Sequence, residues 1–405
     1  MRILILFLMM ATPLTAQMTV PVQRGAAFAP QPVAMDAWQA GFRAKALAAG
    51  ISAAVFDEAF RHFRYDTNTR TQDANQAEFV RPIWDYLDDA VSNGRVNTGR
   101  TKAGELRDTL ASLERQYRVD GQVLIAIWGM ESAFGGFRGN TNVISALANA
   151  AHDGRRRDFA EAELIAALRI IASGEISAVD MVGGWSGAMG HTQFMPSTYL
   201  RYAQDFNKDG RRNVWGENPR DALASSANYL RELGWDYRAP WGMEVMLPRG
   251  FDYALIGEYQ TERVRFWNDR GVRTVGGQQL PNHGATALIA PTGANGPVFA
   301  VFPNFQVIRK YNMSVAYSLA VGHLSDRIAG AGSFTATWPH GDTQLKRSEI
   351  REIQERLNAM GLDTAGVDGM IGPASVEAIQ AFQQRIGMLP DGYATREVLE
   401  ALRRQ

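Results

Sequence analysis

Residues 123–130 carry the feature that most constrains the fold, a run of Val, Leu, Ile, Ala, Ile, Trp, Gly and Met without a charged side chain. A helix that is apolar on every side has to be buried. The run therefore predicts a core helix, preceded by a second helix with apolar residues at helical spacing from Leu106 to Tyr117. Because Glu131 follows the run directly, the sequence predicts one carboxylate at the end of a buried helix.

A carboxylate in this position resists ionisation, because burial disfavours the charged form. This is the property that a general acid needs when it protonates a sugar oxygen near neutral pH. A structural explanation stands beside the catalytic one, in which Glu131 closes the helix end or pairs with an arginine. The segment alone leaves both open.

Apolar residues at intervals of three and four predict further helices, over 36–65, 158–173, 219–233 and 314–328. Residues 240–310 differ, because β-branched and aromatic clusters are broken there by Gly and Pro. These clusters predict a small sheet, and they lie at 245–247, 298–302 and 305–308. We therefore expect a mainly α (α+β) fold with a small β-rich insert.

The chain of 405 residues is long enough for two folded units. Gly, Ser, Thr and Pro residues give 331–345 the composition of a linker between a large lobe, 35–330, and a small domain, 346–405. The small domain has three short apolar periodic segments with Asp-Gly turns at 368–369 and 391–392. It is expected to be a three-helix module.

The first 16 residues have a charged start, a short apolar run and small residues before Gln17, which predicts a signal peptide, 1–16, followed by a mobile leader, 17–34. Cysteine is absent, so neither a disulfide framework nor a lipid-carrying cysteine is expected. Lys+Arg and Asp+Glu both number 42, which argues against nucleic acid as the partner. We expect an exported, periplasmic protein without a transmembrane segment.

Residues 185–199 mix glycines and small polar residues with Met, Gln and aromatic residues, a composition that suits the wall of a groove. Glycines allow close approach of a ligand to the backbone. Gln193 can hydrogen-bond a hydroxyl or an amide, and Trp185 or Phe194 can stack on a sugar. A turn that caps a helix starting near Ser197 would explain the glycines as well.

A second loop has the opening of a calcium-binding EF-hand. Asp205, Asn207 and Asp209 occupy loop positions one, three and five, and Gly210 occupies position six. Arg211 would bind through its carbonyl oxygen. Position twelve is Gly216, where an ordinary EF-hand has a bidentate glutamate, so the simple motif is broken.

Four ordered motifs in this chain resemble the membrane-bound lytic murein transglycosylase B family, glycoside hydrolase family 103. They are GMESAFG around Glu131, SGAMGHTQFMPSTY from Ser186, DFNKDGRRNVW from Asp205 and YNMSVAYSLAV from Tyr311. The resemblance covers roughly residues 36–330 and implies a lysozyme-like fold. It also implies cleavage of the glycan strand of peptidoglycan.

In that family the glutamate at the position of Glu131 is the sole catalytic acid and base. The resemblance implies that it protonates the oxygen of the MurNAc-GlcNAc β-1,4 bond and then deprotonates the C6 hydroxyl, giving 1,6-anhydro-MurNAc. No second carboxylate is needed, unlike in most glycosidases. Carried over by position, the residues expected to contact sugar or line the cleft are Ser186, Met189, Gln193, Phe194, Asn312 and Tyr317. For Asn312 and Tyr317 another explanation is open, in which they cap and pack the last helix.

The resemblance also supplies an aspartate that closes the metal loop at the start of the next helix, which maps onto Asp221, with Glu217 as a competitor. The expected cofactor is a structural Ca²⁺ held by Asp205, Asn207, Asp209, Arg211 and Asp221, and no organic cofactor is expected.

Residues 346–405 resemble the peptidoglycan-binding domain type 1 family, through I-x-x-I-Q-x-x-L from Ile350 and D-G-x-x-G-P-x-S from Asp368. The expected partner is therefore peptidoglycan glycan strands, with proteins of cell-wall synthesis or division as open candidates. Two other functions remain: a hydrolytic muramidase that admits water, and a peptidoglycan-binding protein without catalysis.

Overall fold

The computed structural model describes residues 35–65, 81–153 and 156–405. The expected signal peptide, 1–16, and leader, 17–34, lie outside the described residues. The described part is mainly helical with a small sheet, which confirms the expected fold class. No helix within these ranges is long and apolar enough to cross a membrane.

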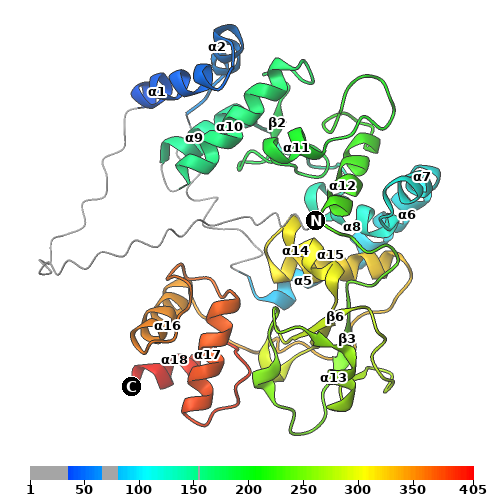
Figure 1. Ribbon diagram of the computed structural model, residues 1–405, viewed down its shortest axis with the longest axis vertical. Coiled ribbons are helices and arrows are strands. Elements are labelled where there is room, and N and C mark those ends of the chain that lie inside the picture. The colour runs from blue at the N-terminus through cyan, green and yellow to red at the C-terminus, as the bar shows by residue number, and fades with distance from the viewer. Residues whose placement is uncertain (1–34, 66–80, 154–155) are drawn as a thin grey trace, which may run out of the picture.

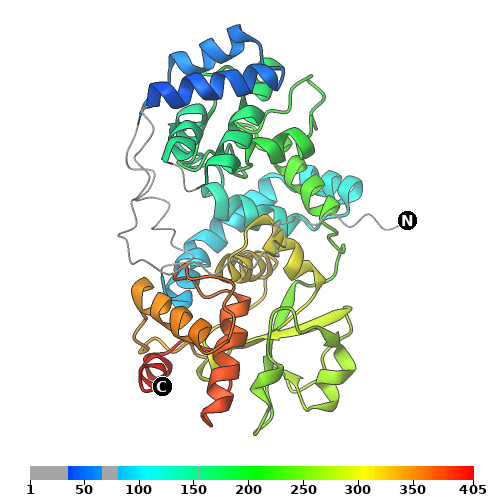
Figure 2. The same ribbon diagram turned by 60° about the vertical axis from the view of Figure 1, so that its left-hand side comes forward.

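One helical layer lies at the end of the molecule that carries the first described residues (Figures 1 and 2). Its helices share one apolar core that includes Phe42, Phe56 and Leu164. They are α1 (Met35–Ala48), α2 (Ala53–Arg61), α9 (Val143–Asp153), α10 (Arg157–Ala172) and α11 (Pro196–Tyr202). A two-stranded antiparallel ribbon, β1 (Thr141–Asn142) with β2 (Val182–Gly183), accompanies these helices.

The centre of the molecule is a second helical core built around α8 (Gly121–Ser132), the helix expected from the apolar run. Its main packing partner is α15 (Val315–Ile328), which begins after Ser314 as expected. The surrounding helices are α5 (Ile83–Ala90), α6 (Asn93–Glu105), α7 (Arg107–Tyr117), α12 (Arg220–Glu232) and α14 (Pro303–Tyr311). From Val123 to Gly129 every residue of α8 is buried, so the sequence-based prediction of a core helix is confirmed.

An antiparallel sheet lies on the other side of this core (Figure 1). Its strands follow the order β4-β6-β7-β3-β5. They are β3 (Gly242–Met246), β4 (Glu262–Arg263), β5 (Arg273–Thr274), β6 (Ala285–Ile289) and β7 (Val298–Val301), with helix α13 (Val264–Asp269) and 3-10 turns η1 (Tyr253–Leu255) and η2 (Gly293–Asn295) in the connections.

One part of the expected sheet is wrong. Residues 305–308 were expected to extend as a strand, yet they form the middle of α14. Pro303 occupies the first turn of this helix, where the fixed backbone angle of proline favours helix initiation. The apolar cluster is therefore one face of a short helix that packs on the central core.

The C-terminal module consists of α16 (Arg347–Ala359), α17 (Pro373–Arg385) and α18 (Arg396–Arg403), as expected. Its core is separate and includes Ile353, Ile379 and Leu399. Gly369 and Gly392 have φ of 76° and 72°, a left-handed backbone that favours glycine. The two Asp-Gly turns are thus located where the sequence predicts them.

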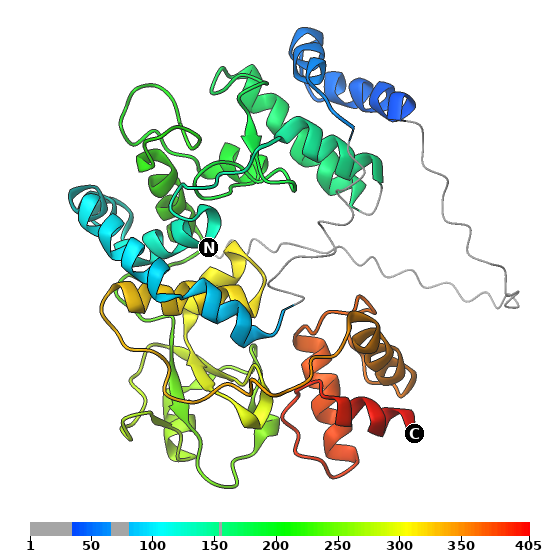
Figure 3. The ribbon, with the colours of Figure 1, turned by 180° about the vertical axis from the view of Figure 1, so that it is seen from behind.

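The segment 331–345, which has a linker composition, is packed onto the sheet and crosses it in Figure 3. Glu244 of β3 accepts hydrogen bonds from the backbone N–H groups of Thr335 and Ala336, both at 2.6 Å. The Phe334 ring stacks on His323 with a centroid separation of 3.7 Å. Burial lowers the pKa of His323 to about 4, so this imidazole is neutral at pH 7.

The C-terminal module docks on the turns that connect the strands. Gln380 of α17 is 6% exposed and donates to the carbonyls of Tyr253 and Ile256, at 3.2 and 2.8 Å. Asp391 accepts a hydrogen bond from the backbone N–H of Ala294 at 3.1 Å. A Cβ atom on Gly293 would lie 2.4 Å from Asp391. The contact is therefore a close, hydrogen-bonded interface.

Replacing Gln380 by Glu should undock the module. The carboxylate would face two carbonyl oxygens and could donate to neither, and burying such an unpaired charge is costly. We expect a larger radius of gyration in small-angle X-ray scattering and faster proteolysis within residues 331–345. Gln384→Glu, at an exposed position of the same helix, is the matched control and should leave both unchanged. Equal scattering curves for the two variants would contradict a docked module.

Candidate active site

Glu131 lies in the last turn of α8, and its position is set by the way this helix ends. Ala133, Phe134 and Gly135 follow with φ of 49°, 58° and 83°, so the chain turns sharply away from the helix. Phe134 folds back on Gly129, where a Cβ atom would lie 2.6 Å from the ring. The Phe134 ring can occupy this place because residue 129 has no side chain.

Two further contacts fasten α8 to His191. The Trp128 indole N–H donates to His191 Nδ1 at 3.0 Å. The Ser132 hydroxyl donates to the His191 carbonyl at 2.6 Å. The pKa of His191 is lowered, mainly by burial, so its ring acts as a neutral structural partner. The segment 185–195 is thereby held against the helix that carries Glu131.

Tyr317 of α15 contacts the candidate acid directly. Its hydroxyl donates to Glu131 Oε1 at 2.5 Å, and its side chain is otherwise buried in the core. Burial raises the pKa of Tyr317 well above its usual value, and the nearby Glu131 carboxylate raises it further. Tyr317 is therefore a stable hydrogen-bond donor to the carboxylate.

Tyr311 is a second tyrosine beside Glu131, and the sequence analysis did not select it. Burial and the charge of Glu131 raise the pKa of Tyr311. Its hydroxyl donates to the carbonyl of Thr192 at 2.7 Å and lies 3.3 Å from Ser226 Oγ of α12. Tyr311 therefore links α14, α12 and the 185–195 segment next to the acid. Its partners are distant in sequence, so only the folded structure shows this role.

The other residues that were expected to bind sugar or line the cleft differ in how far they are exposed. Ser186 is partly exposed, as a cleft residue should be. Met189 and Phe194 are 0% and 2% exposed, so the expectation that they line the cleft is wrong. They pair through backbone hydrogen bonds of 2.8 and 3.0 Å, which turn both side chains into the core beneath the cleft wall.

Gln193 and Asn312 both make structural hydrogen bonds. Gln193 has φ of 49°, and its amide donates to the carbonyls of Arg138 and Gly190 at 3.2 and 2.8 Å. It joins the loop after α8 to the 185–195 segment. Asn312 ends α14, and its side-chain oxygen accepts from the backbone N–H of Ser314 at 3.0 Å. Both side chains are partly exposed, which is compatible with sugar contact.

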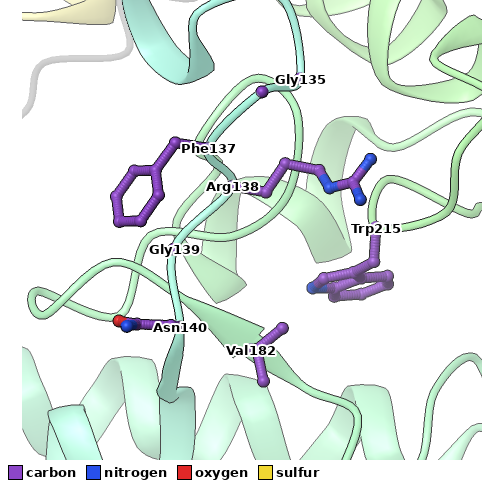
Figure 4. Close-up of a pocket in the computed structure, with 8 residues that line it drawn as sticks. Gly135, Phe137, Arg138, Gly139, Asn140, Val182 and Trp215 are labelled. Atoms are coloured by element: carbon purple, nitrogen blue, oxygen red, sulfur yellow. The ribbon is translucent and has the colours of Figure 1, made fainter.

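A hollow of about 310 Å³ lies along the loop that leaves α8 (Figure 4). Its walls include the ring of Phe137, which is 65% exposed, and the ring of Trp215. The Arg138 guanidinium is held by Glu217 at 2.7 Å and by the Gly216 carbonyl at 3.3 Å. Aromatic faces beside fixed polar groups suit a saccharide. No single stretch of sequence predicts this hollow, because its walls come from three separate segments.

The acidic loop is closed by hydrogen bonds from its backbone to its own carboxylates. Asp205 accepts from the backbone N–H groups of Asp209 and Gly210, and Asp209 accepts from that of Arg211. Asp221, at the start of α12, accepts from the N–H groups of Phe206 and Asn213 at 3.0 Å each.

The donor chemistry of this loop fits a hard cation. The pKa of Asp221 is raised, mainly by burial, and the charge of Asp205 adds to this effect. Within the described ranges, no three His, Cys, Asp or Glu side chains form a metal-binding group by themselves. The Asn207 amide and the Arg211 carbonyl would therefore have to complete an oxygen set, as is usual for Ca²⁺. Glu217, the competing candidate, pairs with Arg138 in this structure.

Comparison with known proteins agrees with this site. The family described as "Transglycosylase SLT domain" matches residues 34–326, and "Putative peptidoglycan binding domain" matches residues 346–402. Membrane-bound lytic murein transglycosylase B of Escherichia coli (strain K12) is 30% identical over 251 residues, which is 60% of this chain. The match spans 66% of that relative, just under two thirds of its length.

Solved structures are similar as well. SltB3 from Pseudomonas aeruginosa, in complex with NAG-anhNAM-pentapeptide, is 45% identical with a TM-score of 0.86, covering 91% of this chain and 99% of that one. Escherichia coli Slt35, in complex with calcium, is 25% identical with a TM-score of 0.62, covering 72% and 92%. The fold is thus that of a lytic transglycosylase. The chain belongs to the transglycosylase SLT family of peptidoglycan-cleaving lytic murein transglycosylases.

Tyr317→Phe tests the contact to Glu131. Removing the hydroxyl deletes a preorganised donor to the carboxylate and should lower the rate of peptidoglycan cleavage by about 10- to 100-fold. The rate is measured as muropeptide release from purified sacculi, with the unfolding temperature measured in parallel. Tyr117→Phe removes another buried tyrosine hydroxyl, which contacts Gln204, and should keep the wild-type rate. A fully active, folded Tyr317→Phe would show that this hydrogen bond plays no part in catalysis.

Proposed function

We propose that this chain cleaves the MurNAc-GlcNAc β-1,4 bond of peptidoglycan and leaves 1,6-anhydro-MurNAc ends, with Glu131 as sole acid and base. The observation that carries the proposal is the contact of Glu131 with Tyr317 at the end of a buried helix, within a family of lytic transglycosylases. The complex of SltB3 with NAG-anhNAM-pentapeptide supports it, because that ligand contains the anhydro sugar.

The chemistry needs one carboxylate in two protonation states. Protonated Glu131 gives its proton to the glycosidic oxygen as the C1–O bond breaks, and GlcNAc leaves with a free hydroxyl. The Glu131 carboxylate then takes the proton of the C6 hydroxyl, and the C6 oxygen bonds to C1. Glu131 ends protonated as it began, and no water is consumed. The Tyr317 hydroxyl is placed to stabilise the carboxylate between the two steps.

The hollow in Figure 4 is assigned to the glycan strand near the cleavage point. Phe137 and Trp215 offer ring faces to a sugar, and Arg138 and Asn140 offer hydrogen-bond donors. Ser186, Gln193 and Asn312 remain proposed sugar contacts, while Met189 and Phe194 support the wall from beneath. The proposed location is the periplasm, where such a substrate is found and where the pattern of residues 1–16 would direct the chain.

Mass spectrometry of products tests the reaction. Purified protein incubated with sacculi should release muropeptides lighter by one water than the corresponding hydrolysis products, because C6 replaces water as the nucleophile. Glu131→Gln should release none, while Glu262→Gln, an exposed carboxylate on β4, should remain active. Products with a free reducing end would indicate a muramidase. No products from the wild type would favour a binding protein without catalysis.

We also infer that the acidic loop holds a structural Ca²⁺ through Asp205, Asn207, Asp209, Asp221 and the carbonyl of Arg211. The crystal structure of Slt35 in complex with calcium supports this assignment. A bound cation would offset the repulsion between Asp205 and Asp221 and would fix the segment that leads to Trp215. Its proposed role is structural, because the loop offers the hard oxygen donors that hold Ca²⁺ in folded loops.

Calcium should raise the unfolding temperature of chelator-treated protein by several degrees, because a ligand that binds only the folded state stabilises it. Differential scanning calorimetry with and without Ca²⁺ measures the shift. Asp209→Asn should reduce it, and Asp269→Asn, an exposed aspartate on α13, should not. An unfolding temperature that is insensitive to saturating Ca²⁺ would exclude the site.

A further inference from the structure

Helix α14 is short, and it brings Tyr311 and Asn312 to the active site at its last turn. A helix of nine residues has little stability of its own, so tertiary contacts decide its position. Its first turn is held by Asn304, whose amide group makes hydrogen bonds of 2.8, 2.8 and 2.7 Å to the backbone of Asp236 and Ala239. The last turn needs an anchor of its own.

Arg309 and Glu258 form that anchor. Their side chains are 8% and 5% exposed, and the guanidinium donates to both carboxylate oxygens, at 2.6 and 3.2 Å. Gln306, one turn earlier on the same helix, also donates to the Glu258 carbonyl at 3.4 Å. A bidentate pair of this kind fixes orientation as well as distance. Burying it is costly, which calls for a reason beyond stability.

The geometry of the helix places this pair behind Tyr311. Residues two apart on an α-helix point about 200° from one another, so Arg309 faces the sheet side while Tyr311 faces Thr192 and Ser226. Glu258 is held firmly in turn, because Gly257 donates to the carbonyl of Leu288 in β6 at 3.0 Å. The ion pair therefore ties the last turn of α14 to the sheet.

A displacement of the last turn of α14 would be transmitted toward Glu131 through Tyr311. Its hydroxyl holds the carbonyl of Thr192, and its ring contacts Phe194 and Tyr229. The 185–195 segment also reaches α8 through His191. A shift of the last turn of α14 would thus move the 185–195 segment relative to Glu131.

We propose that the buried Glu258–Arg309 ion pair is a positioning device for the active site, and that it acts on catalysis through Tyr311. The proposal rests on the transglycosylase function proposed above. The hydrogen bonds of the two side chains join them to each other and to Gln306, so the proposal treats both as positioning residues. The pair aligns Tyr311, which holds the 185–195 segment beside Glu131.

The test is a double-mutant cycle on the full chain, with release of anhydro-muropeptides as the rate. The variant Glu258→Met/Arg309→Met replaces both charges by apolar side chains, and such replacement of a whole buried pair commonly preserves stability. We expect an unfolding temperature near that of the wild type and a kcat lower by about tenfold, since small misplacements are expensive in catalysis. Arg309→Lys keeps the charge but not the bidentate geometry, and it supplies the same measurement if the double variant does not fold.

The second arm of the cycle is Tyr311→Phe. If the pair acts through Tyr311, removing the pair in the Tyr311→Phe background should cost less than twofold further, so that the two effects are not additive. Effects that multiply fully would overturn the proposal, as would a folded pair variant with wild-type kcat. Glu161→Leu, which removes the acceptor of the Trp38 indole N–H and the charge partner of Lys45, is the control and should change stability without changing kcat. An inactive wild type would instead refute the proposed function.

Discussion

The hydrogen bond between Tyr317 and Glu131 is the contact on which the rest of the site depends. It joins α15 to α8 at the edge of the central apolar core. A carboxylate at the edge of such a core is tolerated only where a donor meets it, and that donor is located by the packing of two helices. The arrangement of the other elements follows, because α12, α14 and the 185–195 segment all gather around this pair through Tyr311.

The parts of this fold that sequence predicts well are those whose signals are local. The apolar run before Glu131, the start of α15 at Ser314 and the Asp-Gly turns of the small domain are each determined by neighbours a few residues apart. The expected strand at 305–308 failed because a short apolar cluster fits a strand or a buried helix equally well. Pro303, two residues earlier, was the available signal for a helix.

The 185–195 segment shows why binding residues are harder to predict from sequence than Glu131. A glycine-rich segment with Met and Phe suggests an exposed binding surface. In the folded chain the backbone of Met189 pairs with that of Phe194, and both side chains turn inward. The local sequence does not mark Tyr311 as a site residue, because it follows a lysine in an ordinary helix. Its contact with Thr192 spans 119 residues of sequence. Such roles depend on which segments the fold brings together.

The segment 331–345 shows that composition alone is a poor guide to the flexibility of a connecting segment. Its Gly, Ser, Thr and Pro content is typical of a flexible tether, but it also contains Phe334 and Trp338, whose rings pack on Phe299. Two aromatic residues in a linker are themselves a sign of packing, because exposing them is unfavourable. Together with Glu244 and Gln380 they attach the C-terminal module to the catalytic lobe. A flexible tether raises the local concentration of substrate over every distance that it can span. A docked module instead holds its ligand at one offset from the catalytic lobe, so the spacing between the bound wall and the proposed cleavage point becomes a property of the fold.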